Sequence, residues 1–281
     1  MDKMNFKLRF GPAGMPLALK GKKLYEGIEY VSKIGLNALE VEFVQGVRYN
    51  KEDAIKASEA AKKHDVWLSC HGPYFINCCS PVKEKQETSK RNLYQALEAA
   101  TILGAKVVVF HPGFYQGQTP EKAKENAVKL LKEVIEMIKE KKWTAVLGAE
   151  TTGKPSQYGS LDEILELCKI LGTKYFRPVV DWGHMHARGN GAIKSQKDFE
   201  DIVKKIKDSL GQEGLDGLHC HFSELTFSEK GEKYHIPLGT SNSPNYHWLA
   251  DVIKKHKLKF TMICESPLLE KDALKMQKMC S

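Results

Sequence analysis

The sequence lacks any run of about 18 apolar residues, the length that a membrane-spanning helix would require. Its first residues, Met1 to Phe6, do not form the apolar core of a signal peptide. The seven cysteines are odd in number and irregularly spaced, so they do not suggest a disulfide framework and fit a reducing compartment. We therefore expect a protein that is neither membrane-bound nor secreted, with a cytoplasmic location.

The 281-residue chain also lacks low-complexity tracts, linkers and breaks in composition. Its hydrophobic fraction of 42% and charged fraction of 28% are ordinary for a globular protein with a sizeable core. We therefore expect a single domain over residues 1–281. The net charge of +8 favours a polyanionic partner such as nucleic acid, but many lysines lie in helix-like stretches where a solvated face explains them.

Short β-rich runs alternate with longer amphipathic stretches along the whole chain. The predicted strands are Asn5–Phe10, Ala38–Phe43, Val66–Cys70, Lys106–Phe110, Ala145–Ala149, Phe176–Val180, Leu215–Cys220 and Lys259–Cys264. The predicted helices are Lys22–Ile34, Lys51–His64, Lys85–Leu103, Pro120–Lys141, a helix between Ser160 and Leu171, Ser195–Leu210, Asn245–His256 and Leu268–Met279. Phe222 to Pro244 is expected to be a long polar loop.

Eight strand–helix units in a chain of this length are typical of a (β/α)8 TIM barrel. A doubly wound open sheet is the alternative, but no glycine-rich dinucleotide turn follows the first predicted strand. In a barrel, the residues just past each strand meet at one mouth. The side chains at that mouth therefore decide the chemistry.

Six consecutive predicted strands end in side chains that can bind metal ions. These residues are His71, His111, Glu150, Asp181 with His184 beyond it, His219 with His221, and Glu265, and the long loop adds His235. Histidine and carboxylate together form the ligand set of hydrolytic zinc or manganese centres. More than four ligands imply two or three ions, with Glu150 as the natural bridge, although a lone histidine at a strand end is more often hydrogen-bonded structure.

Several neighbouring residues have simpler interpretations. His219 and His221 are two residues apart and share a strand face, which leaves either as the ligand; we favour His219. Cys70, Cys220 and Cys264 alternate with the proposed ligands and are expected to pack in the core beneath the helices. His186 is expected to lie behind the ligands or at the surface. The stretch from Val179 to His186 is expected to leave its strand as a loop.

The ordered motifs resemble those of the endonuclease IV family, within the xylose-isomerase-like TIM barrels. The matching segments are His71-Gly72-Pro73-Tyr74, Phe110-His111-Pro112-Gly113, Glu150-Thr151-Thr152-Gly153, Val180-Asp181-Trp182-Gly183-His184, Leu218-His219 and Cys264-Glu265-Ser266. The resemblance extends from the first predicted strand to the eighth.

The resemblance implies a cluster of three metal ions, usually zinc. It assigns His71, His111 and Glu150 to one ion, and Glu150, Asp181, His219 and Glu265 to a second. His184 and His235 belong to the third. There the family also uses an aspartate two residues before the final histidine, where this chain has Lys233. The neighbouring Glu232 could replace that aspartate; otherwise the centre holds two ions.

The resemblance further implies hydrolysis of the phosphodiester on the 5′ side of an abasic site in double-stranded DNA, as in base excision repair. Glu150 would be the catalytic residue that orients the attacking water or accepts its proton. Tyr74 matches a DNA-contacting aromatic residue of the family, and Arg48 is a looser match to a residue that probes the minor groove.

Two other functions fit the same residues. The same barrel and mouth carboxylates could serve a sugar isomerase or epimerase, which would need a single divalent ion and a closed pocket. The chain could also be a DNA-binding homologue with weakened catalysis, an alternative that Lys233 keeps open. The histidine-rich set and the basic charge favour phosphate esters as the substrate.

Overall fold

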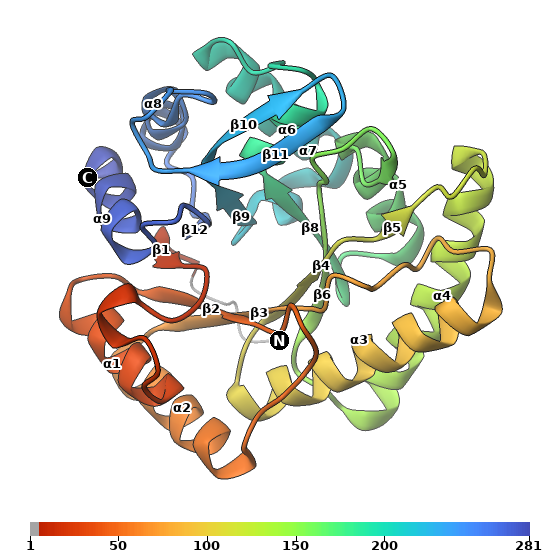
Figure 1. The fold of residues 1–281 in the computed structure, drawn as a ribbon, viewed down its shortest axis with the longest axis horizontal. Helices are drawn as coiled ribbons and strands as arrows, with labels where there is room; N and C mark the ends of the chain where they lie inside the picture. Colours follow the sequence, from red (N-terminus) through yellow and green to blue (C-terminus); the bar gives the residue numbers. More distant parts are fainter. Residues whose placement is uncertain (1–5) are drawn as a thin grey trace.

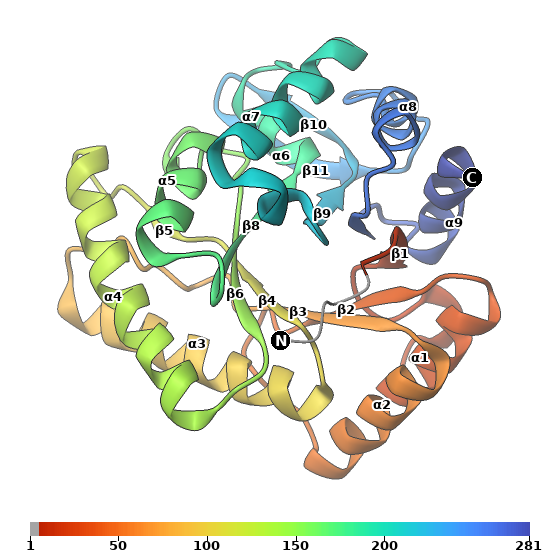
Figure 2. The same cartoon turned by 180° about the vertical axis from the view of Figure 1, so that it is seen from behind.

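The computed structural model describes residues 6–281, whose parallel strands form a barrel surrounded by helices (Figures 1 and 2). Met1 to Asn5, which include the start of the first predicted strand and most of the segment searched for a signal peptide, lie outside the described residues. The barrel strands are β1 (Arg9–Pro12), β2 (Ala38–Glu42), β3 (Trp67–His71), β4 (Val107–Phe110), β6 (Val146–Glu150), β8 (Phe176–Asp181), β9 (His219–Phe222) and β12 (Thr261–Cys264). The predicted (β/α)8 barrel is confirmed.

The helices outside the strands follow the predicted order. They are α1 (Leu24–Lys33), α2 (Lys51–His64), α3 (Lys83–Leu103), α4 (Pro120–Lys141), α5 (Leu161–Leu171), α7 (Gln196–Leu215), α8 (Tyr246–His256) and α9 (Glu270–Cys280), with a short 3-10 turn at Leu17–Leu19. Local signals set several of their ends. Thr119 caps α4 ahead of Pro120, and Ser160 and Glu163 form a capping box at α5. None of these helices in residues 6–281 combines the length and apolarity that crossing a membrane requires.

The sheet runs in the order β1-β12-β9-β8-β6-β4-β3-β2, and contacts between its two edge strands close the barrel. Ala13 bridges Glu40 in parallel fashion, and the Gly14 amide donates to the Glu40 carbonyl at 2.9 Å. This approach requires Gly11, because a Cβ atom there would lie 1.8 Å from the Ala38 carbonyl oxygen. Closure brings β2 beside β1 and so places β2 side chains inside the barrel.

Two expected loops are partly regular structure. Asp181 accepts a hydrogen bond from the His184 amide and caps α6 (Trp182–Arg188), so the chain leaves β8 as a helix rather than as a loop. The predicted polar loop after Phe222 contains the hairpin β10 (Glu224–Ser228) and β11 (Gly231–Ile236), which lies over the barrel in Figure 1. Exposed Glu229, Lys230 and Lys233 give the segment the polar character of a loop and hide its strand pattern in the sequence.

Smaller differences concern strand ends and a second small pairing. The helix α7 continues past the predicted end at Leu210 through a kink at Gly211, so the next strand begins at His219 rather than at Leu215. The short strands β5 (Gly113–Phe114) and β7 (Gln157–Tyr158) pair beside the mouth of the barrel.

Candidate metal centre

Strand register decides which side chains meet at the barrel mouth. Neighbouring parallel strands pair Asp181 with His221, and Glu150 with Val179. The side chains of successive inward-facing residues enter the barrel about 7 Å apart, because each residue of a strand rises ~3.3 Å. The last inward-facing residue of each strand therefore forms one layer at the mouth, and the preceding one lies a layer deeper.

The first ligand group joins β3, β4 and β6. His71 Nε2 lies 3.2 Å and His111 Nε2 3.0 Å from Glu150 Oε2. The His71 Nδ1 atom is 2.8 Å from the Gly72 carbonyl oxygen, an acceptor, so Nδ1 carries a proton and Nε2 faces the group. These three side chains are the set expected for the first ion, and the structure brings them together.

The second ligand group contains Glu150, Asp181, His221 and Glu265. His221 Nδ1 lies 3.1 Å from Glu150 Oε1 and 3.2 Å from Glu265 Oε1. Glu150 thus turns one oxygen toward each group, which is the orientation of a bridging carboxylate. Asp181 Oδ2 is buried and has no hydrogen-bond partner in the described residues.

The histidine of this second group is His221, where the sequence analysis favoured His219. His219 lies two residues before His221 on β9, and it is His221 that is paired with Asp181, so the His219 side chain enters the barrel one layer below that of His221. There its Nε2 atom lies 2.9 Å from Glu40 Oε2. His219 and His221 share a strand face but differ in their depth within the barrel. That depth depends on how β9 is paired with β8, which the sequence alone does not show.

The third ligand group contains His184, Glu232 and His235. His184 Nε2 lies 3.3 Å from Glu232 Oε2, while Lys233 is exposed. In a regular strand, residues 232 and 235 would point to opposite faces. The hairpin contains a β-bulge: Thr226 pairs with Tyr234 and Phe227 with Glu232, which leaves Lys233 without an opposite residue and turns Glu232 toward the face of His235.

Gly153 makes room for this arrangement. A Cβ atom at Gly153 would lie 2.3 Å from Glu232 Oε2, and the Glu232 amide donates to the Gly153 carbonyl at 3.0 Å. The Glu150-Thr151-Thr152-Gly153 motif thus contributes both a ligand and the space for another one. Glu232, given only as a possible substitute from the sequence, lies in the group, and Lys233 does not.

A cavity of about 440 Å³ opens above the three groups. It is lined by Ala13, Glu42, Val44, His71, Tyr74, His111, Phe114, Lys154, Gln157, His184, Glu232, His235, Glu265 and Leu269. Tyr74 is 60% exposed, and its ring centroid is 5.6 Å from that of His71. Arg48 is exposed but lines a separate pocket beside β2 and α2, so the structure does not bring it to the ligand groups.

Two glutamates on β2, the buried Glu40 and the half-buried Glu42, also face the site and were missed in the sequence analysis. Glu40 Oε1 lies 2.9 Å from His221 Nε2, and Glu42 lines the cavity. Burial raises the pKa of Glu42 to about 8. The signal was present in Leu39-Glu40-Val41-Glu42-Phe43, because two acidic residues two positions apart in a buried strand must share one face.

The charges at the mouth depend on one another. Burial alone would raise the pKa of Glu150, but His111 and His221 outweigh it and hold that pKa well below its usual range. Burial raises the pKa of Asp181 far above its ordinary value despite His184. Burial lowers the pKa of His71, but Glu150 and Glu42 more than compensate and raise it to about 10.

These residues fit divalent cations. The ligand atoms of each group lie within 4.8 Å of one another. A buried carboxylate oxygen without a partner, such as Asp181 Oδ2, requires a proton or a cation. Metal binding would displace the protons that the histidine nitrogens now carry toward the carboxylates. Nitrogen and carboxylate donors without thiolates suit zinc or manganese. The three nearby cysteines, Cys70, Cys220 and Cys264, are buried in the main apolar core, as expected.

Comparisons with known proteins agree with the fold and with the family resemblance. An uncharacterized protein of Methanocaldococcus jannaschii is 34% identical over 271 residues, which is 96% of each chain. A probable endonuclease 4 of Aquifex aeolicus is 27% identical over 171 residues, 60% of each chain.

Solved structures share the barrel at lower identity. Endonuclease IV from Thermus thermophilus superposes with a TM-score of 0.73 at 20% identity, covering 97% of both chains. A D-tagatose 3-epimerase-like protein gives 0.71 at 20% identity, covering 97% of this chain and 95% of the other. Residues 28–279 match the family described as Xylose isomerase-like TIM barrel. The chain therefore belongs to the xylose isomerase-like TIM barrel family, and it has sequence relatives named endonuclease 4.

Proposed function

We propose that this protein is a metal-dependent endonuclease that hydrolyses the phosphodiester on the 5′ side of abasic sites in double-stranded DNA. One observation carries the proposal: three ligand groups meet at a single mouth, and Glu150 belongs to two of them. That arrangement offers more ligands than one ion can use. It suits a reaction in which negative charge develops on several oxygens of one phosphate.

Each group of side chains has a distinct task in this proposal. His71 and His111 would hold one ion with Glu150, and Asp181, His221 and Glu265 would hold a second. His184, Glu232 and His235 would hold a third. Bound zinc would supply a water of lowered pKa and Lewis-acid stabilisation of phosphate oxygens. Glu150, turned toward two groups, would orient the attacking water and accept its proton.

The rim of the cavity supports a nucleic-acid substrate. Tyr74 and Phe75 are 60% and 54% exposed, and Phe114, which lines the cavity, is 39% exposed. Exposed aromatic side chains are suited to stacking against bases. An abasic nucleotide loses less stacking when it turns out of the helix, so deformability could supply the selectivity. Arg48, which lines the separate pocket beside β2 and α2, remains a proposed DNA contact.

The rival function is a sugar isomerase or epimerase. The second ligand group alone provides four donors, enough for one ion, and this observation favours the rival. Metal analysis of the purified chain separates the two. Two or three zinc ions per chain support the nuclease, and a single magnesium or manganese supports the isomerase.

The decisive experiment is incubation with a duplex oligonucleotide that carries one abasic site, beside a matched undamaged duplex. We expect incision at the abasic site with zinc or manganese, leaving a 3′ hydroxyl, and none after chelation. An intact abasic strand under every metal condition contradicts the proposal. Tight binding without incision would identify a DNA-binding homologue with weakened catalysis.

A further inference from the structure

We propose that Glu40 is a positioning residue that fixes His221 with its Nδ1 atom toward the metal centre. Glu40 is fully buried in the layer below the mouth, and its Oε1 atom lies 2.9 Å from His221 Nε2. The other ring nitrogen of His221 faces Glu150 and Glu265. This inference rests on the metal centre of the proposed function and is independent of the DNA substrate.

Both ring nitrogens of His221 face carboxylates, which accept hydrogen bonds or bind cations, so both nitrogens carry protons while no ion is bound. An ion held by Glu150 and Glu265 would replace the proton on Nδ1, whose lone pair would then serve as a metal ligand. The proton that stays on Nε2 would face Glu40. A carboxylate behind a histidine ligand also fixes the ring orientation and raises its basicity. Glu40 thus determines both which atom binds and where it points.

Two other residues form hydrogen bonds with Glu40 and hold it in place. Ser69 Oγ donates to Glu40 Oε2 at 2.6 Å, and His219 Nε2 lies 2.9 Å from the same oxygen. The His219 Nδ1 atom is buried and has no partner in residues 6–281, so His219 is best described as a donor to Glu40. His219, which the sequence analysis favours as a ligand, thus has a supporting role: it holds Glu40, and Glu40 positions His221.

The first test is a zinc titration of the full metal-stripped chain against a competing chelator. Glu40→Gln keeps the side-chain size but weakens the acceptor facing His221. We expect one binding step to weaken by about 10–100-fold, the usual effect of removing such a partner, and the other steps to remain. The matched control is Glu166→Gln on α5, the same change at an exposed glutamate that pairs with Lys124, and it should leave every binding step unchanged. An unchanged isotherm for Glu40→Gln overturns the inference.

The second test is read from the wild-type protein. In 15N spectra of zinc-loaded wild-type protein, we expect His221 to show a zinc-bound Nδ1 and a protonated, exchange-protected Nε2, with its signals assigned by their loss in His221→Asn. Zinc on Nε2, or a His221 without bound zinc, overturns the inference. A wild-type chain that binds no zinc removes the metal centre itself. Failure to incise abasic DNA, with the expected spectrum intact, rejects only the substrate.

Discussion

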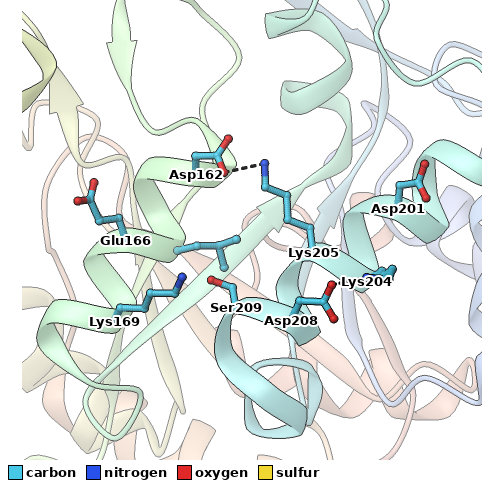
Figure 3. Close-up of a pocket in the computed structure, with 9 residues that line it drawn as sticks. Asp162, Glu166, Lys169, Asp201, Lys204, Lys205, Asp208 and Ser209 are labelled. Atoms are coloured by element: carbon cyan, nitrogen blue, oxygen red, sulfur yellow. Dashed lines mark hydrogen bonds and ion pairs between the residues drawn. The ribbon is translucent and has the colours of Figure 1, made fainter.

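The barrel mouth and the groove between α5 and α7 are of similar size and both are crowded with charged side chains. The mouth cavity measures about 440 Å³ and the groove about 460 Å³. The groove is lined by Asp162, Leu165, Glu166, Lys169, Asp201, Lys204, Lys205, Asp208 and Ser209, most of them labelled in Figure 3. Size and charge density therefore do not distinguish the two regions.

Burial and the type of partner do distinguish them. In the groove, lysines pair with exposed acids. Lys205 Nζ lies 2.6 Å from Asp162 Oδ1, a pair marked by a dashed line in Figure 3, and Lys204 pairs with Asp208. In each such pair the lysine neutralises the charge of the acid. At the mouth the central acids, Glu150 and Asp181, are fully buried. Imidazoles, which can exchange a proton for a metal ion, are the main partners of the acids there. A concentration of charge indicates a ligand site when its charges are buried and incompletely neutralised.

The largest effect is expected from Glu150→Gln. Because Glu150 bridges two ligand groups and is the proposed proton acceptor, we expect incision of abasic DNA to fall by about 10³-fold or more while binding of that DNA persists. Gel assays of cleavage and binding measure the two effects. Glu166→Gln in the groove is the matched control and should cleave normally. Loss of folding in Glu150→Gln would show that Glu150 is structural, and equal rates for both variants would remove the distinction between the regions.

A smaller effect separates two histidines of the same strand. His221→Asn removes a proposed ligand atom, so zinc affinity should fall by more than about 100-fold at one step, beyond what loss of an outer partner causes. His219→Asn removes only a donor to Glu40 and should weaken the same step by less than about tenfold. Competitive zinc titration measures both. The reverse order would return His219 to the ligand set.

The bulge of the hairpin gives a third comparison. Glu232→Ala removes a carboxylate from the third group, and we expect the zinc content to fall by one ion per chain in samples dialysed against trace zinc. Lys233→Ala alters the adjacent exposed residue and should leave the content unchanged. Elemental analysis of the two variants decides between them. Equal loss in both would mean that the hairpin fold, rather than the Glu232 carboxylate, holds the third ion.

The pH dependence of stability tests Glu42, a half-buried acid that is not a proposed ligand. Burial raises the pKa of Glu42 from 4.5 to about 8, so the folded chain retains a proton that the unfolded chain releases. Folding stability contributed by this proton is present below about pH 4.5 and is lost as pH rises toward 8. Metal-free Glu42→Gln should therefore melt on the order of 5 °C above wild type at pH 8 and nearly equally at about pH 4. A difference that is constant with pH contradicts this.

The parts of the site that follow from strand ends could be predicted from the sequence. His71, Glu150 and Asp181 end predicted strands, and a barrel collects such residues at one mouth whatever its detailed register. Glu40 could also have been found from the sequence, since Glu40 and Glu42 alternate with apolar residues and therefore share one face of the strand.

The remaining parts depend on tertiary alignment. The choice between His221 and His219 is made by the register of β9 against β8, which the packing of the whole barrel sets. The β-bulge determines that Glu232 rather than Lys233 faces the third ligand group. The hairpin also contacts Gly153 there, through the hydrogen bond from the Glu232 amide to the Gly153 carbonyl. A shift of one residue reverses the face of every later side chain in a strand, so local sequence cannot decide these positions.

The smallest effect is expected in the groove itself. Lys205→Ala removes the ion pair with Asp162, whose side chains are 48% and 74% exposed. Exposed ion pairs contribute roughly 0–1 kcal/mol because water and salt screen them, so the melting temperature should change by about 2 °C at most. Zinc content and abasic-site incision should equal those of wild type. A marked loss of either activity or metal in this variant would mean that the groove takes part in function, and that burial does not separate the two regions after all.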